Sequence, residues 1–121
     1  MPYEVTDTDT AAALGSGDVP VLATPRLIAL MEAATVQVAE PYVGAGQTTV
    51  GTGVRIEHRR ATPVGNSIDI IATPPHTVTS HRLTFGVQAV DSSGHVIATG
   101  EIDRVIVDRD GFLAAATRTN H

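Results

Sequence analysis

The sequence predicts an α+β fold in which an antiparallel β-sheet wraps around one long central α-helix. Three observations support this prediction: one long apolar stretch with helical character, several later stretches in which apolar and polar residues alternate, and short turn-forming connections between them. A chain of 121 residues has room for one sizeable core. We therefore expect a single domain over 1–121, with an N-terminal strand and flap over 1–18 and a C-terminal tail over 109–121.

The central helix is predicted over Val21–Glu40. Thr24 is a favourable N-cap residue, and Pro25 suits the first helical position, where its missing N–H breaks no hydrogen bond. No Gly or Pro occurs from Leu27 to Ala39, and Ala, Leu and Met favour helix. The polar residues of this helix form one narrow stripe, which consists of Arg26, Gln37 and Glu40, together with Ala29 and Ala33. The rest of the helix surface is apolar. One small sheet cannot cover all of it, so we expect a second subunit to cover the remainder.

Glu32 is the one charged residue of this stretch that lies outside the polar stripe. It lies about 120° from the centre of the stripe, on the same side as Ile28 and Val36. A carboxylate on the covered side of a helix costs free energy unless it is paired or partly hydrated. We therefore treat Glu32 as a candidate for chemistry, with an ion pair to a structural Arg or Lys as the alternative.

The remaining elements are predicted to be strands joined by turns. Asp91–Gly94 is typical of a hairpin turn, so the last two strands are expected to pair antiparallel. Asp7–Asp18 is rich in turn-forming residues and is predicted to be a loop or mobile flap, whereas Asp110–Thr117 is predicted to be a short helical tail. The predicted strands are Tyr3–Thr6, Thr48–His58, Ser67–Ala72, His76–Val90 and His95–Asp108.

The strand predicted over Thr48–His58 carries a candidate functional histidine. His58 shares its face with Val54 and Ile56 and so points toward whatever the sheet covers. Strict alternation places Gly51 on the opposite face. Glycine weakens a strand, so Gly51 and Gly53 predict either a bulge or a place where something approaches the backbone closely.

Composition excludes several classes of function. A formal net charge of −5 argues against a nucleic-acid-binding protein, and two Tyr, two Phe and no Trp leave few platforms for base stacking. The chain has no Cys, so disulfides, thiol nucleophiles and thiolate metal sites are excluded. No apolar run approaches the about 20 residues that span a bilayer, and no secretory signal pattern is recognisable at the start. We therefore expect a cytoplasmic protein without a membrane partner.

Four segments of the sequence carry a resemblance to a known family: VLATPRLIALMEAA (Val21–Ala34), TVGTGVRIEH (Thr49–His58), ATPVG (Ala61–Gly65) and the end of the last strand, GEIDRVIVD (Gly100–Asp108). The predicted arrangement resembles the hotdog fold, in which a sheet wraps a central helix and dimers bury the helices. The four segments resemble, more specifically, the fluoroacetyl-CoA thioesterase family of hotdog proteins. The resemblance covers most of the chain between the central helix and the last strand.

This resemblance implies a set of site residues. Thr24, Glu32 and His58 match the active-site threonine, glutamate and histidine of the family, and Gly51 matches the glycine whose backbone N–H faces the thioester carbonyl. Thioester hydrolysis needs a nucleophile or activated water, a base, and donors for the developing oxyanion, and these four residues offer each of them. Glu32 would act as base or nucleophile and His58 would move a proton near neutral pH.

Several of these residues also have a purely structural interpretation. Thr24 is explained by helix capping, His58 by a hydrogen-bonded position at the core edge, and Gly51 by a bulge. Arg59 and Arg60 follow His58 directly and are candidates for binding the phosphates of coenzyme A, or else form a solvated strand end. His76, His81 and His95 have no metal-ligand spacing, so we predict that they are surface residues and that there is no metal site.

Helix geometry limits how these residues can meet. Thr24 and Glu32 are eight helical residues apart, which corresponds to about 12 Å of rise, so they are not expected to touch. Either the imidazole of His58 bridges part of that gap, or one group comes from a partner chain. The sequence does not choose between these arrangements.

We therefore predict an acyl-CoA thioesterase that hydrolyses a small acyl thioester to the free acid and coenzyme A. It is expected to need no cofactor, since coenzyme A belongs to the substrate, and to form a homodimer or tetramer. Acyl carrier protein stays open as the alternative carrier.

The fluoroacetyl-specific member carries Phe residues in a lid before the threonine, whereas Leu14–Ala23 contains no aromatic residue, so we predict no fluoroacetyl specificity. The main alternative is a non-catalytic binding module for acyl thioesters or small ligands on the same scaffold; a hotdog dehydratase is a weaker one.

Overall fold

The computed structural model describes residues 1–119, and the side chains of residues 1–118. It contains six strands and one long helix with shorter helical segments at both ends of the chain. In chain order the elements are β1 (Pro2–Glu4), η1 (Asp7–Asp9), α1 (Ala11–Leu14), α2 (Thr24–Ala39), η2 (Glu40–Tyr42), β2 (Gln47–His58), β3 (Ser67–Ala72), β4 (Thr77–Thr79), β5 (Arg82–Asp91), β6 (Val96–Asp108) and α3 (Arg109–Thr119).

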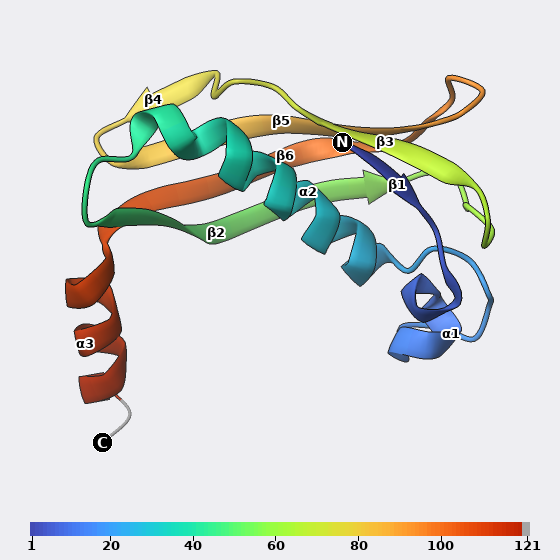
Figure 1. Cartoon of the computed structure of the whole chain (residues 1–121), viewed down its shortest axis with the longest axis horizontal. Coiled ribbons are helices and arrows are strands. Elements are labelled where there is room, and N and C mark those ends of the chain that lie inside the picture. The colour runs from blue at the N-terminus through green and yellow to red at the C-terminus, as the bar shows by residue number, and fades with distance from the viewer. Residues whose placement is uncertain (120–121) are drawn as a thin grey trace.

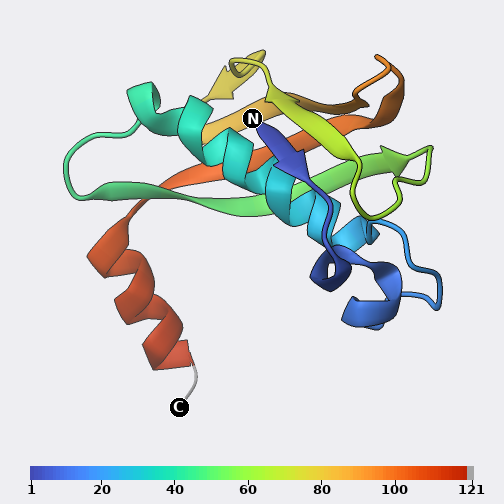
Figure 2. The same cartoon turned by 45° about the vertical axis from the view of Figure 1, so that its right-hand side comes forward.

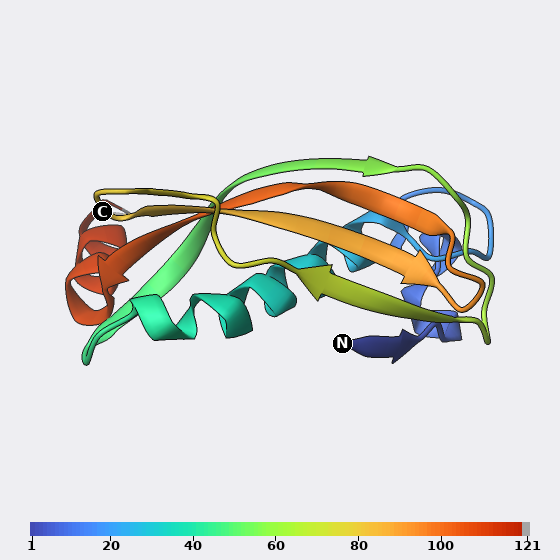
Figure 3. The ribbon, with the colours of Figure 1, turned by 90° about the horizontal axis from the view of Figure 1, so that it is seen from above.

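The strands form one antiparallel sheet in the order β1-β3-β5-β6-β2, with the short β4 paired to β5. Helix α2 crosses one face of this sheet along its length, and the sheet curves around it (Figures 1 and 3). Strand β2 lies at one end of this order, so it has a strand neighbour on one side only among the described residues. The predicted antiparallel sheet around a central helix is thus confirmed.

The core lies between α2 and the sheet. Leu27 and Met31 of α2 are fully buried and pack with inward-facing residues of β3, β5 and β6, which include Ile68, Ile70 and Ile102. The spacing of four residues between Leu27 and Met31 puts both on one helix face, as burial requires. The opposite face of α2 stays open, and Val36 there is 50% exposed.

Helix α3 continues directly from β6 and projects away from the sheet (Figures 1 and 2). It extends the helix predicted over Asp110–Thr117 by one residue at its start and two at its end. The last two residues of the predicted tail, 120–121, lie outside the described residues.

Two predictions about secondary structure are wrong. The strand expected over His76–Val90 is a hairpin of β4 and β5, because the chain reverses at Ser80, which has a left-handed φ of 54°. The segment Asp7–Asp18, expected to be a loop, contains η1 and α1. The Thr10 side chain caps α1 by accepting a hydrogen bond from the Ala13 N–H, and Gly15 ends it with φ 72°.

Gly100, in the centre of the sheet, allows β6 and β2 to approach each other. Gly100 pairs with Ile56 of β2, and a Cβ at this position would overlap the backbone carbonyl oxygen of Arg55, the residue before Ile56. We expect Gly100→Ala to lower the free energy of unfolding by about 3 kcal/mol, because backbone cannot yield as a side-chain tip can. Urea unfolding measures this change. Gly44→Ala is the control, since its Cβ would meet only the side chain of Gln47, and a matching loss there would contradict the account.

No helix among the described residues is long and apolar enough to cross a membrane.

Candidate active site

Thr24 and His58 form the first part of the site. The Thr24 hydroxyl and the His58 Nδ1 atom are 2.8 Å apart and share a hydrogen bond. Thr24 begins α2 and His58 ends β2, so the pair joins the two elements where they meet. The predicted N-cap role of Thr24 is wrong: Ala23 occupies the cap position, and no side chain caps the helix there. The hydroxyl binds the imidazole instead.

The other ring nitrogen of His58 is available for chemistry. His58 Nε2 is buried and makes no hydrogen bond to the described residues. Burial lowers the pKa of His58 below its usual value, although the backbone of Arg60 acts in the opposite direction. The ring is half-buried and favours the neutral form near pH 7. In the tautomer in which Nδ1 donates to the Thr24 hydroxyl, Nε2 can accept a proton from a bound substrate or water.

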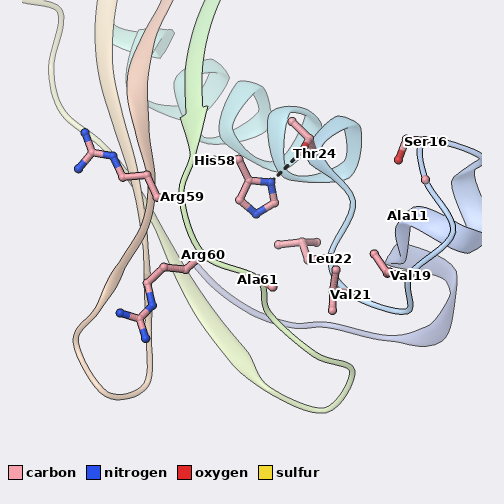
Figure 4. A pocket seen from close by; sticks show the side chains of 11 residues that line it. Ala11, Ser16, Val19, Val21, Leu22, Thr24, His58, Arg59, Arg60 and Ala61 are labelled. Atoms are coloured by element: carbon pink, nitrogen blue, oxygen red, sulfur yellow. Dashed lines mark hydrogen bonds between the residues drawn. The ribbon is translucent and has the colours of Figure 1, made fainter.

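The ring borders a pocket of about 320 Å³. One wall is mainly aliphatic and comes from the chain between α1 and α2, whereas Thr24 and the residues from His58 onward supply polar groups (Figure 4). A concave site of this size, which offers both aliphatic and polar groups, is suited to binding a small molecule. The lining residues are Ala11, Ser16, Gly17, Val19, Val21, Leu22, Thr24, His58, Arg59, Arg60 and Ala61.

Arg59 and Arg60 also line this pocket, but their side chains extend away from the His58 ring (Figure 4). The Arg59 Nε atom lies 3.0 Å from a carboxylate oxygen of Glu57, and both side chains are more than half exposed. An exposed ion pair of this kind contributes little to stability and can exchange for another anion. The binding of coenzyme A phosphates by these two arginines stays a prediction.

Glu32 lies in a second cluster, against Arg104 of β6. The Glu32 carboxylate is 3.6 Å from an Arg104 guanidinium nitrogen, and its side chain is 38% exposed, whereas that of Arg104 is 8% exposed. Arg104 also donates to the hydroxyl and the backbone carbonyl of Thr49, at 2.8 and 3.1 Å. Burial lowers the pKa of Arg104 and the charge of Glu32 opposes this change. Glu32 therefore has a partner that holds its carboxylate beside the sheet while leaving it open to solvent.

Arg104 was missed by the sequence analysis although the pattern contained a signal for it. In β6, Ile102 is fully buried on the side of the sheet that α2 covers, and Ile106 packs against the buried cluster near the end of α2. Arg104 lies midway between them and therefore shares their face. A charged residue on the covered face of a strand requires an acidic partner, and Glu32 on the facing helix is that partner.

Gly51 adjoins the carboxylate of Glu32. A Cβ on Gly51 would lie only 2.6 Å from a carboxylate oxygen of Glu32, so Gly51 faces α2 and its missing side chain leaves room for the acid. A β-bulge produces this orientation: Gly51 pairs with Arg104 and Gly53 with Asp103, which leaves Thr52 as an extra residue. The predicted bulge is confirmed.

The bulge also corrects the expected alternation of β2. Strict alternation placed Gly51 and His58 on opposite faces, but one extra residue reverses the faces beyond it. Gly51 before the bulge faces α2, and Ile56 after the bulge packs against the core beneath α2. Both Gly51 and His58 therefore lie on the side of the sheet that α2 covers.

The structure thus places the predicted residues in two clusters rather than one. Thr24 and His58 lie at the start of α2, whereas Glu32 and Gly51 lie two turns further along. The helical rise from Thr24 to Glu32 is about 12 Å. Gly51 and His58 are seven positions apart on β2, one of which the bulge takes up, so the distance along the strand is about 20 Å. Within one chain the Glu32 carboxylate and the His58 ring therefore do not touch.

Among the described residues, no group of three or more His, Asp or Glu side chains could hold a metal ion.

The hydrogen bond between Thr24 and His58 leads to a testable prediction. Thr24→Val keeps the shape of the side chain but removes the bond that orients the imidazole, so we expect kcat for thioester hydrolysis to fall roughly 10- to 100-fold. Thr24→Ser keeps the hydroxyl and is expected to stay within about threefold of the parent protein. Steady-state kinetics with both variants checks this, and equal rates for Thr24→Val and the parent would contradict a role for the pair.

Comparisons with known proteins identify the family. The model of the family described as FlK, fluoroacetyl-CoA-specific thioesterase, matches residues 5–110. The fluoroacetyl-CoA thioesterase of Streptantibioticus cattleyicolor is 32% identical over 94 residues, which cover 78% of this chain and 66% of that protein. The chain therefore spans just under two thirds of the length of this relative.

Solved structures agree with this result. A crystal structure of a variant of FlK in complex with fluoroacetate and CoA superposes with a TM-score of 0.89 at 27% identity, covering 100% of this chain and 98% of that one. A Thermus thermophilus protein of the thioesterase superfamily gives a TM-score of 0.90 at 24% identity, covering 99% of this chain and 88% of that one, and supports the fold alone.

These findings confirm the predicted hotdog fold and the predicted resemblance to the fluoroacetyl-CoA thioesterase family. The chain that gives these matches carries a hydrogen-bonded threonine–histidine pair beside a pocket, and a glutamate beside a glycine at a β-bulge. The protein belongs to the fluoroacetyl-CoA-specific thioesterase family.

Proposed function

We propose that the protein hydrolyses a small acyl-CoA thioester to the free acid and coenzyme A. The observation that carries this proposal is the His58 ring, which Thr24 holds through Nδ1, while its second nitrogen is buried beside a pocket and has no hydrogen-bond partner among the described residues. A buried, unpaired and neutral imidazole nitrogen is costly as structure but useful as a proton acceptor. The family membership gives the thioester as the substrate class.

The remaining groups complete the chemistry. The Glu32 carboxylate either attacks the thioester carbonyl or removes a proton from an attacking water; in both routes the oxygen of water ends in the acid and a proton ends on the coenzyme A sulfur. The Gly51 N–H donates to the developing oxyanion, and its missing side chain lets the carbonyl approach. The guanidinium of Arg104, on β6, orients the Glu32 carboxylate through their ion pair. Thr24, Glu32 and His58 are thus the proposed catalytic residues.

The two clusters act on one thioester if they come from two protomers. In a two-fold symmetric dimer, Glu32 and Gly51 of one chain face Thr24 and His58 of the other, and two equal sites result. Two features support this arrangement. The face of α2 that the sheet leaves open includes exposed Val36, and β2 is a strand of 12 residues at the sheet edge, where an unpaired edge invites a partner. A tetramer would add a further interface outside these sites. The cytoplasmic location expected from the sequence stays a prediction.

A panel of acyl-CoA substrates tests the function. We expect release of free thiol from short acyl-CoAs, with acetyl-, propionyl-, butyryl- and fluoroacetyl-CoA compared under one set of conditions. Thermal unfolding with each compound is measured in parallel. Hydrolysis of none of them, combined with a raised melting temperature in their presence, would replace the enzyme by a non-catalytic binding module. If none of these compounds is hydrolysed and none raises the melting temperature, both the enzyme and the binding module are contradicted.

A further inference from the structure

Asp9 is a buried carboxylate that the proposed chemistry does not use. It ends η1 and its side chain is 2% exposed. It accepts hydrogen bonds from the Tyr3 hydroxyl at 2.7 Å and from the backbone N–H and hydroxyl of Thr6 at 2.8 and 3.0 Å. Burial alone would raise the pKa of Asp9, but these bonds and the nearby Arg26 outweigh it and hold the pKa below its usual value. Asp9 is therefore ionised at neutral pH.

Asp9 holds the first turn of α2 at two points. Its carboxylate lies 3.1 Å from the Nε atom of Arg26, the third residue of α2. Its backbone carbonyl accepts a hydrogen bond from the N–H of Ala23, the N-cap residue, at 2.8 Å. These two contacts lie on either side of Thr24, the residue that binds the His58 ring.

Thr24 itself is exposed and belongs to neither of the two hydrophobic core clusters of the described residues. Its hydroxyl position depends on the backbone of the first turn, because the cap position is taken by Ala23 and no side-chain cap holds the helix end. A buried ionised carboxylate with several donors is a rigid anchor, since charge-assisted hydrogen bonds are shorter and stronger than neutral ones. The anchor therefore adds to the packing of Ala23 and Leu27, which are buried on either side of Thr24.

We propose that Asp9 is a positioning residue, which fixes Thr24 and through it the orientation of the His58 imidazole. This inference rests on the proposed function for its kinetic consequences but not for its structural ones. Asp9 touches neither the pocket nor the proposed reacting atoms. Two hydrogen bonds connect Asp9 to the ring: one joins Asp9 to the start of α2 at Ala23, and the other joins Thr24 to His58.

The test is Asp9→Asn, which keeps the size of the side chain but removes its charge and part of its accepting capacity. We expect kcat to fall roughly tenfold or more, because a shift of about 1 Å at a catalytic group is enough for such a loss. In the double variant with Thr24→Val, the further fall below Thr24→Val alone is expected to be no more than about threefold, since both changes act through the same bond. Rates are compared at a temperature where each variant is folded.

A spectroscopic readout does not depend on activity. We expect the ¹⁵N spectrum of His58 to show one dominant tautomer in the parent protein and an averaged mixture in Asp9→Asn, because Nδ1 loses its fixed partner. Asp91→Asn is the matched control: that carboxylate also accepts several hydrogen bonds, two of them from the backbone N–H groups of Ser93 and His95, but it lies at the turn between β5 and β6. The control is expected to lower stability without changing the His58 tautomer.

Two results would overturn the proposal: an unchanged His58 tautomer in folded Asp9→Asn, or full multiplication of the Asp9→Asn and Thr24→Val effects on kcat. If Asp9→Asn does not fold, Arg26→Met takes its place, since it removes only the ion pair to α2 and leaves the other bonds of Asp9 intact. If the parent protein hydrolyses no thioester, the proposed function fails, while the tautomer measurement still decides the role of Asp9.

Discussion

Replacing Glu32 by Gln is expected to lower kcat/KM for acyl-CoA hydrolysis by roughly 10³-fold, since an amide neither attacks a carbonyl nor removes a proton from water. The side chain keeps its size and remains partly exposed, so the protein is expected to fold. The measurement is free-thiol release under single-substrate conditions, together with thermal unfolding of the same preparation.

The ion pair with Arg104 is the structural complication of this substitution. Glu32→Gln leaves the buried guanidinium without its counter-charge, which lowers the free energy of unfolding by roughly 1–3 kcal/mol. Glu40→Gln, an exposed glutamate directly after α2, is the control and is expected to change neither activity nor stability. A Glu32→Gln variant that is folded and retains a third or more of the parent activity would contradict the assignment of Glu32 as the reacting acid.

Replacing His58 by Ala is expected to lower kcat/KM by roughly 10²- to 10⁴-fold, the range usual for a general base. The pH profile gives the sharper test. Because burial lowers the pKa of His58 below 6.5, the neutral base persists under weakly acidic conditions, and the acid limb assigned to His58 is expected below pH 6.5. In His58→Ala this limb disappears. A limb above pH 6.5, or one unchanged in His58→Ala, would contradict the role of His58.

The same pKa shift has a consequence for stability. In the unfolded chain His58 binds a proton as the pH falls through its usual value near 6.5, whereas in the folded protein it does so only at lower pH. The unfolded state therefore binds more protons between the two values, and stability falls as the pH drops from 6.5 through the folded pKa. Urea unfolding of the parent and of His58→Ala is expected to show a smaller loss over this window in the variant.

Much of the fold could be predicted because its signals are local. The helix around Leu27 and Met31 follows from a run of helix formers without Gly or Pro, and the antiparallel pairing of β5 and β6 follows from the turn sequence at Asp91–Gly94. The turn at Ser80 could not be predicted in this way, because serine is not a typical residue for a left-handed position. The fold of the N-terminal segment was also missed, since Asp9 is buried there by contacts with residues on both sides of it.

The site was predictable by residue type but not by geometry. The role of Thr24 could not be separated from capping, because the sequence does not show which hydrogen bond the hydroxyl makes. The bulge at Gly51 was predicted, but its effect on the faces of β2 depends on where the extra residue is placed in the ladder with β6. Arg104 was missed because its significance appears only when β6 and α2 are packed together.

The division of the site between two protomers can be measured directly. Glu32→Gln and His58→Ala, each nearly inactive alone, are mixed under conditions that allow subunits to exchange. If Glu32 of one protomer acts with Thr24 and His58 of its partner, each mixed dimer has one complete site, and random mixing restores about a quarter of the parent activity. If the complete set acts within one chain, no mixed dimer contains an intact site, and the absence of recovered activity in verified mixed dimers would contradict the account.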